Sequence, residues 1–179
     1  MTRSVRAVSV AMVLLMLSGC SGTKSLATAK VQDYMKTPQN IVGAQVGTGT
    51  PIKPSFKTDL TALMTKCGTS LQFPPAVNKD VIKVSNADAI LTIKEIGHET
   101  TSQLLNGVPT GKVWTSKIRY EFALVDTATN KIVWKGQDDF GQWEPSPLND
   151  ALHGDPTGDW AKTLVEQMQK DGIVGKCGG

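Results

Sequence analysis

Alternation of apolar and polar residues in the second half of the chain constrains its fold more than any other feature. In 118–124 every second residue is large and apolar, which predicts a β-strand with one buried and one solvent-facing side. The turn-forming run 126–130 follows, and the apolar run 131–135 returns as the partner strand. A third alternating run, 89–94, precedes them, with turn residues at 106–111 between the two. The sequence therefore predicts three consecutive antiparallel strands.

Two amphipathic helices are expected on either side of these strands. In the first, the apolar residues of 56–67 recur every three or four positions, with Ser55 as the N-cap and Gly68 just past the end. The second opens with Asp155 as the N-cap and Pro156 at its first position. Its apolar stripe is formed by Trp160, Leu164, Val165 and Met168.

A weak strand is also expected at 41–47, before the first helix, and a short apolar piece at 71–73 follows that helix. The order strand, helix, strand, three-strand meander and helix indicates the α+β class. We expect a two-layer sandwich, in which a mixed sheet with a three-strand antiparallel meander carries two helices packed on one face.

The first 20 residues have the pattern of an export signal. Arg3 and Arg6 precede an apolar run, 7–17, that is too short to span a membrane. The run ends in Leu17-Ser-Gly-Cys20, which resembles the lipobox of bacterial lipoproteins. That resemblance implies cleavage before Cys20, a diacylglycerol thioether on its sulfur and an acyl chain such as palmitate on the new amino terminus. The alternatives are an ordinary secretory signal with an unrelated cysteine and a buried hydrophobic strand.

These features divide the chain into a signal peptide, 1–19, a lipidated polar tether, 20–40, and a single α+β periplasmic domain, 41–179. Loss of Arg3 and Arg6 with the signal lowers the formal net charge from +3 to +1. Because so small a charge gives no strong basic surface, nucleic acid is not expected as a partner.

Lipidation of Cys20 leaves Cys67 and Cys177 as an even pair in an exported chain. An oxidising compartment allows such a pair to close, so a Cys67–Cys177 disulfide is expected. The alternative is a pair of free thiols in a zinc or redox site. That alternative is disfavoured, because the chain has no Cys-x-x-Cys and neither cysteine has a histidine within four positions.

Signatures of catalysis are missing from the sequence. It has no nucleophile elbow, no zinc-protease motif and no phosphate-binding loop. The two histidines, His98 and His153, are far apart in the sequence, and exposed lone histidines are most often ordinary surface residues. The acidic pairs Asp138-Asp139 and Asp155/Asp159 fit no calcium loop. We therefore expect no enzyme activity, no metal and no cofactor.

Three apolar residues at exposed positions are candidates for partner binding. Trp143 lies in a Pro-rich loop where periodicity does not require its burial, and aromatic residues are favoured anchors at protein interfaces. Its alternative role is to pack back over the sheet edge or the last helix. Leu104 and Leu105 lie at a hairpin turn, where exposed aliphatic residues suggest contact with a partner, a second protomer or lipid.

Two stretches resemble a known group of proteins. One is 85–93, with an Ala-Asp pair at the start of a strand, and the other is 120–136, with the pattern Leu-x-Asp-x-x-Thr-Asn-x-x-x-Trp from Leu124 to Trp134. Together they resemble the periplasmic α/β lipoproteins related to the TolB amino-terminal domain. That group includes penicillin-binding-protein activators, curli-secretion lipoproteins and exopolysaccharide-export lipoproteins. The resemblance implies a protein that binds other envelope proteins, often as an oligomer, and it carries over no catalytic residue.

The anchor and the resemblance together suggest a non-enzymatic lipoprotein of the outer membrane, facing the periplasm, that acts as an accessory or scaffold subunit of an envelope assembly, secretion or export complex. The short tether favours this over an activator of an inner-membrane synthase, and Ser21 stands where a retention signal would typically be Asp. The alternative function is a lipoprotein that binds a small ligand or a glycan.

Overall fold

The structure is a computed structural model that describes residues 26–106, 108–141 and 157–178. For 103–105 and 114–116 it describes the backbone alone. The elements in chain order are β1 (Ala27–Lys30), β2 (Asn40–Val46), α1 (Pro54–Lys66), β3 (Ser70–Gln72), α2 (Lys79–Val84), β4 (Ala89–Leu105), β5 (Val108–Asp126), β6 (Lys131–Gly141) and α4 (Thr157–Lys170).

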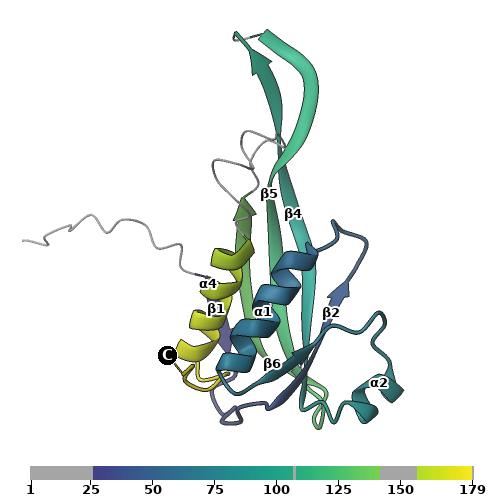
Figure 1. Cartoon of the computed structure of the whole chain (residues 1–179), viewed down its shortest axis with the longest axis vertical. Coiled ribbons are helices and arrows are strands. Elements are labelled where there is room, and N and C mark those ends of the chain that lie inside the picture. The colour runs from purple at the N-terminus through teal and green to yellow at the C-terminus, as the bar shows by residue number, and fades with distance from the viewer. Residues whose placement is uncertain (1–25, 107, 142–156, 179) are drawn as a thin grey trace, which may run out of the picture.

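The described strands form one mixed sheet in the order β1-β6-β5-β4-β2-β3. β4, β5 and β6 pair antiparallel in sequence, as the alternating pattern predicts, and β2 runs parallel to both β3 and β4. Helices α1 and α4 lie side by side across one face of this sheet (Figure 1). The predicted α+β class, with a mixed sheet, a meander and two helices on one face, is therefore confirmed.

The core between sheet and helices is centred on Trp160 of α4. Its ring lies 4.0 Å from Phe56 of α1 and 5.1 Å from Tyr120 of β5, measured between ring centroids. The apolar stripe predicted for α4 is confirmed, because its four members are all buried. Burial of large aromatic side chains on both layers supplies much of the hydrophobic stabilisation of such a fold.

The structure moves the start of the domain to an earlier residue than expected. Leu26 and Tyr34 are buried, and β1 pairs antiparallel with β6, from Ala27 opposite Gln137 to Lys30 opposite Trp134. The boundary predicted at residue 40 is therefore wrong, and 26–40 belongs to the folded domain. The segment is short and polar because β1 is an edge strand held by backbone pairing, which leaves little apolar periodicity to detect.

The first helix differs from expectation at its N-terminal end and agrees with it at its C-terminal end. α1 begins at Pro54, its N-cap is Lys53, and no side chain caps it, so the prediction of Ser55 as the N-cap is wrong. Proline is favoured in the first turn because the missing N–H has no partner there. At the other end Gly68 follows the helix with φ +76°, as predicted for a stop position. Asp155 and Pro156, the predicted start of the last helix, lie outside the described residues.

The hairpin formed by β4 and β5 is much longer than the alternating pattern predicts. β4 pairs with β2 only as far as Lys94, and β5 pairs with β6 only from Lys117 onward. Beyond these points the two strands pair with each other and project past the ends of both helices (Figure 1). Asn106, at the turn, has φ +52°, which agrees with the predicted turn position.

Candidate interaction surfaces

The projecting part of the hairpin, 100–106 and 108–116, is called the arm below. Within the described residues it has no strand on either side, and a two-stranded hairpin alone is only marginally stable in water. Its valines are nonetheless exposed, Val108 to 65% and Val113 to 62%. In the backbone register Val108 lies opposite Leu105 and Val113 opposite Ser102. The arm therefore presents Val108 and Val113 to solvent, and no second layer of described residues packs on it.

The edges of the arm are poorly suited to pairing with another strand. The β4–β5 register shifts between Glu95 and Gly97, between Glu99 and Thr100, and between Ser102 and Leu104. Bulges of this kind twist a ribbon and interrupt the row of backbone donors and acceptors that an added strand would need. A partner would therefore contact the arm through its side chains rather than extend the sheet.

Charged residues surround the base of the arm. The Arg119 guanidinium donates to both carboxylate oxygens of Asp139, at 2.6 and 3.2 Å, and these bonds hold the pKa of Asp139 below its usual range. Lys117 lies 3.4 Å from Glu99 and 3.5 Å from Asp139. These pairs are largely exposed, so each contributes little to stability. Their role is to keep the base of the arm polar.

His98 lies in this region and contacts Glu95, with 2.9 Å between Nδ1 and the carboxylate. The adjacent pocket has a volume of about 110 Å³ and is lined by Gly97, His98, Glu99, Lys117 and Arg119. Ligand sites for small molecules usually measure about 300–1,000 Å³. Among the described residues no group of three or more acidic, histidine or cysteine side chains is arranged to hold a metal ion. His153 lies outside the described part of the chain.

The hairpin pattern that carries the family resemblance has a structural explanation. Asp126 is buried and accepts hydrogen bonds from the Thr129 backbone N–H at 2.8 Å and the Thr129 hydroxyl at 3.1 Å. Lys36 Nζ lies 3.3 Å from the same carboxylate. Burial alone would raise the pKa of Asp126, but the bonds from Thr129 and Lys36 outweigh burial and lower it. Asp126 thus holds the β5–β6 turn closed, while Asn130 supplies the left-handed residue with φ +54°.

The second stretch of the resemblance meets the first at the same end of the sheet. Asp88 accepts hydrogen bonds from the backbone N–H groups of Gln39 and Asn40, at 2.8 and 2.9 Å. The hydroxyl of Thr127 donates to the carbonyls of Ala87 and Asp88. The residues of both patterns therefore hold the ends of several strands together at one end of the sheet, which we call the turn end. They specify the fold and expose no reactive group.

The turn end also binds the last helix and the first strand together. Trp134, the last residue of the resemblance pattern, is buried, and its indole N–H donates to Asp171 at 2.7 Å. Lys30 of β1 donates to the backbone carbonyl of the same Asp171 at 2.8 Å. β1, β6 and the C-terminal end of α4 therefore form one unit.

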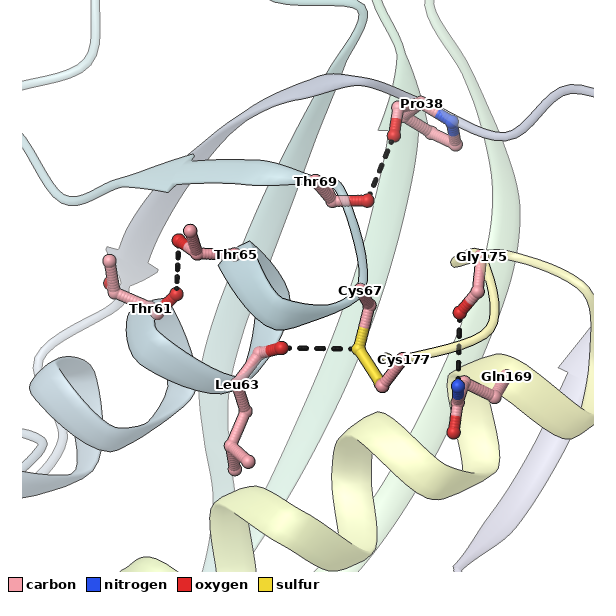
Figure 2. The surroundings of a disulfide bond; sticks show 9 residues. All are labelled: Pro38, Thr61, Leu63, Thr65, Cys67, Thr69, Gln169, Gly175 and Cys177. Atoms are coloured by element: carbon pink, nitrogen blue, oxygen red, sulfur yellow. Dashed lines mark hydrogen bonds between the residues drawn. A yellow bond between two sulfur atoms is a disulfide. The ribbon is translucent and has the colours of Figure 1, made fainter. Parts of the chain in front are cut away.

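A disulfide joins Cys67 and Cys177, the pair expected from the sequence, and Figure 2 shows it between the end of α1 and the C-terminal tail. The adjacent chain is held by a bond from the Gly178 N–H to the Lys66 carbonyl, 3.2 Å long. The sulfur of Cys67 lies 3.1 Å from the Leu63 carbonyl, and since a disulfide sulfur has no hydrogen, this is a close contact. A bridge across a separation of 110 residues can contribute about 2–5 kcal/mol by constraining the unfolded chain.

The structure places two of the three predicted partner-binding residues. Leu104 and Leu105 lie in the arm, one opposite Pro109 and the other opposite Val108. Trp143 lies outside the described residues, as does Cys20, the predicted lipidation site. Val113 could not be identified as an exposed strand residue from the pattern, because threonine and serine near it are also common in loops. The signal that could have found it is the high β-propensity of threonine and valine across 108–115.

The early start of the domain leaves a short connection to the predicted anchor. Cys20 is six Cα steps from Leu26, and Leu26 is packed in the core. A fully extended chain of that length reaches roughly 20 Å. The predicted lipid is therefore confined to the vicinity of β1. In the described part of the chain, no helix is both long enough and apolar enough to cross a membrane.

No protein-family model matches the sequence, and no curated protein matches it. Solved structures do resemble it. PelC from Paraburkholderia phytofirmans, described as a dodecamer, is 13% identical with a TM-score of 0.51, covering 85% of this chain and 98% of that chain. Lipoprotein GNA1162 from Neisseria meningitidis is 16% identical with a TM-score of 0.43, covering 74% of this chain and 99% of that chain. The PelC score shows a shared fold, and proteins titled as bacterial lipoproteins are among the similar structures.

Proposed function

We propose that this chain is a lipid-anchored, non-enzymatic subunit of an outer-membrane assembly that contacts a partner protein through its arm. The observation that carries the proposal is the arm itself, which exposes Val108 and Val113 and has no strand beside it within the described part of the chain. Exposed aliphatic groups that lie together on a projecting hairpin are typical of an interaction site. The proposal includes attachment through Cys20, on the periplasmic face of that membrane, and the relation to the TolB amino-terminal domain.

The length of the connection to Cys20 supports an arm that is directed away from the membrane. Pairing across β6 places Ala27 level with Glu121 of β5, because both lie opposite Gln137. From Glu121 to Val108 the strand rises roughly 40 Å, at about 3.3 Å per residue. Since this is about twice the reach of the connection, an arm directed at the membrane would have its tip roughly 20 Å inside the bilayer while a lipid on Cys20 stays inserted. The exposed Lys112 in the arm disfavours that placement.

The absence of enzyme activity is part of the proposal. The charged groups at the base of the arm are engaged with each other, as Arg119 is with Asp139 and His98 is with Glu95. The pocket beside them is smaller than a usual ligand site. No observation on the described residues favours the alternative of a small-ligand or glycan site. A second copy of the chain is among the partners we consider, because the similar PelC is described as a dodecamer.

Site-specific photo-crosslinking in the native envelope tests this proposal. A photoreactive residue replaces Val113 in the arm, and the control replaces Val84, which is 85% exposed on α2. We expect a discrete adduct from position 113, with mass spectrometry identifying either an envelope protein or a second copy, and none from position 84. The adduct should be lost when Leu104→Asp and Leu105→Asp are added.

Two results would contradict the proposal. One is the absence of any adduct along the arm, with probes at both Val108 and Val113, in cells that express the protein at its normal level. The other is an adduct that forms equally from Val84 and persists with both leucine substitutions, which would show nonspecific contact.

A further inference from the structure

Charge is distributed unevenly along the long axis of the molecule. The turn end is the end of the sheet at which Asn40, Ala89, Asp126 and Lys131 lie in register across the strands. The lysines at this end are Lys30, Lys36, Lys66, Lys79, Lys83, Lys131, Lys170 and Lys176. The described carboxylates at this end are Asp33, Asp80, Asp88, Asp126 and Asp171. Cations therefore outnumber carboxylates there.

Several of these carboxylates are turned toward the protein. Asp88 accepts bonds from two backbone amides, Asp126 is buried within its turn, and Asp171 accepts from the indole of Trp134. The lysines are different, because Lys66 and Lys170 are exposed at the ends of α1 and α4, and Lys176 is exposed in the tail. These carboxylates keep their charge, and Lys30 and Lys36 are also engaged with the protein. The positive potential of this end therefore comes from the excess of lysines, of which Lys66, Lys170 and Lys176 are exposed.

Elsewhere on the described surface cations and carboxylates are equal in number, and several of them lie in opposite pairs. Arg119 pairs with Asp139 and Lys117 with Glu99 at the base of the arm. Lys135 pairs with Glu121 on the sheet, and Lys162 with Glu166 on α4. The unbalanced positive charge of the described chain is thus concentrated at the turn end, opposite the arm (Figure 1).

The turn end is also the end that the predicted anchor can bring to a membrane. β1 runs from Leu26 toward this end, where Lys30 contacts the carbonyl of Asp171. The roughly 20 Å between Cys20 and Leu26 permits the turn end to reach the lipid headgroups, whereas the tip of the arm lies too far away. Anionic phospholipid headgroups attract clustered lysines that lie within a Debye length of the surface.

We propose that the turn end rests on the anionic phospholipid headgroups of the membrane that carries the anchor, so that lysine contacts direct the arm outward. The placement of this membrane relies on the anchored state described above. The lipid supplies attachment, and the lysines, led by Lys66, Lys170 and Lys176, supply orientation. The partner surface is therefore a bilayer of mixed neutral and anionic phospholipid.

Vesicle sedimentation of the unlipidated mature chain tests the lysine contact separately from the lipid. The chain begins at residue 20 and carries Cys20→Ser, a position outside the described residues. Its binding is measured on vesicles of phosphatidylglycerol and phosphatidylcholine in equal parts, and on phosphatidylcholine alone, at low and high salt. We expect binding to the anionic vesicles that weakens at high salt, and little binding to the neutral ones.

Two matched triple variants locate the contact. The turn-end variant is Lys66→Gln, Lys170→Gln and Lys176→Gln, and we expect it to lose roughly tenfold or more of the partition coefficient for anionic vesicles. The control removes the same charge from exposed lysines elsewhere, with Lys94→Gln, Lys112→Gln and Lys162→Gln. It should stay within about twofold of the parent chain. Thermal unfolding of both variants shows that each is folded.

The inference is overturned if the parent chain binds neutral and anionic vesicles equally, or if the two triple variants lose binding to the same extent. A larger loss in the control would also overturn it, because Lys112 belongs to the arm, and the arm would then be the membrane contact. None of these outcomes depends on lipidation of Cys20. Failure of this contact and failure of the anchor are therefore distinguishable.

Discussion

Asp126 shows how a single buried carboxylate can hold a hairpin turn. It accepts bonds from both the backbone and the hydroxyl of Thr129, and Lys36 lies beside it. Bonds to a charged acceptor are stronger than neutral ones, which is why an aspartate suits the first position of this turn. The residue has a role in stability and none in recognition, since almost none of it reaches the surface.

We predict that Asp126→Asn lowers the free energy of unfolding at neutral pH by about 1–2 kcal/mol, because neutral hydrogen bonds replace charge-assisted ones. The pKa of Asp126 is lower in the folded chain than its usual 3.8, so the ionised carboxylate favours folding. This stabilisation is complete above about pH 4 and is lost as pH falls through the folded pKa. Urea unfolding at neutral pH and at low pH measures the difference between the two proteins.

The difference between Asp126→Asn and the parent chain should therefore shrink in acid. A difference that stays the same at low pH would contradict this explanation. The control is Asp33→Asn, an exposed carboxylate nearby, which should leave the unfolding midpoint unchanged at both pH values. Other carboxylates with lowered pKa values, such as Asp139 and Glu95, affect parent and variant equally.

At the scale of elements, β1 determines where the domain begins. Leu26 packs near Trp134 and lies close enough to Gly136 that a side chain there would collide with it. The edge strand is thus fixed both by backbone pairing and by one buried leucine. This packing shortens the free connection to the predicted anchor and so constrains the orientation of the whole molecule.

Leu26→Ala should lower the free energy of unfolding by about 2–4 kcal/mol, since it removes a buried side chain and leaves a cavity. Val31→Ala, at a position 50% exposed just after β1, serves as the control and should change stability by about 0.5 kcal/mol or less. Equilibrium urea unfolding of the mature chain measures both. If Leu26→Ala were as harmless as the control, residues 26–40 would be a tether after all.

Elements with a regular spacing of apolar residues could be predicted from the sequence. Elements held mainly by backbone pairing could not. The 118–124 strand and the α4 stripe are evident because each buries a regular row of large apolar residues. β1 gives no such row, as three of its residues are Ala, Thr and Ala. The arm was missed because threonine and serine at 100–102 are common in loops, whereas here they form a paired ribbon.

For candidate functional residues, the sequence indicates their chemistry but does not give their positions relative to one another in the fold. Spacing and compartment were enough to pair Cys67 with Cys177, because few cysteines leave few choices. The apolar tip at Leu104 and Leu105 could be found from composition, but its distance from the anchor depends on strand length and register. The uneven charge along the long axis likewise appears only when distant lysines are brought to one end of the sheet.

At the scale of the whole molecule, the turn end and the arm lie at opposite ends of the sheet, and β1, to which the proposed anchor connects, lies between them. In the proposed anchored state the short connection from Cys20 would hold β1 near the bilayer, and the arm extends past the ends of the helices opposite the turn end (Figure 1). A lipoprotein arranged this way displays its contact residues well beyond the headgroups. It can therefore reach a partner that is not itself at the membrane surface.

Energy transfer from two labelled positions to a headgroup-labelled lipid tests this arrangement most directly. The lipidated protein in vesicles is labelled either at Lys131→Cys, in the turn end, or at Val113→Cys, in the arm, which lie roughly 40 Å apart along the sheet. We expect strong transfer from position 131 and weak transfer from position 113. Equal transfer from the two positions, or stronger transfer from position 113, would contradict it.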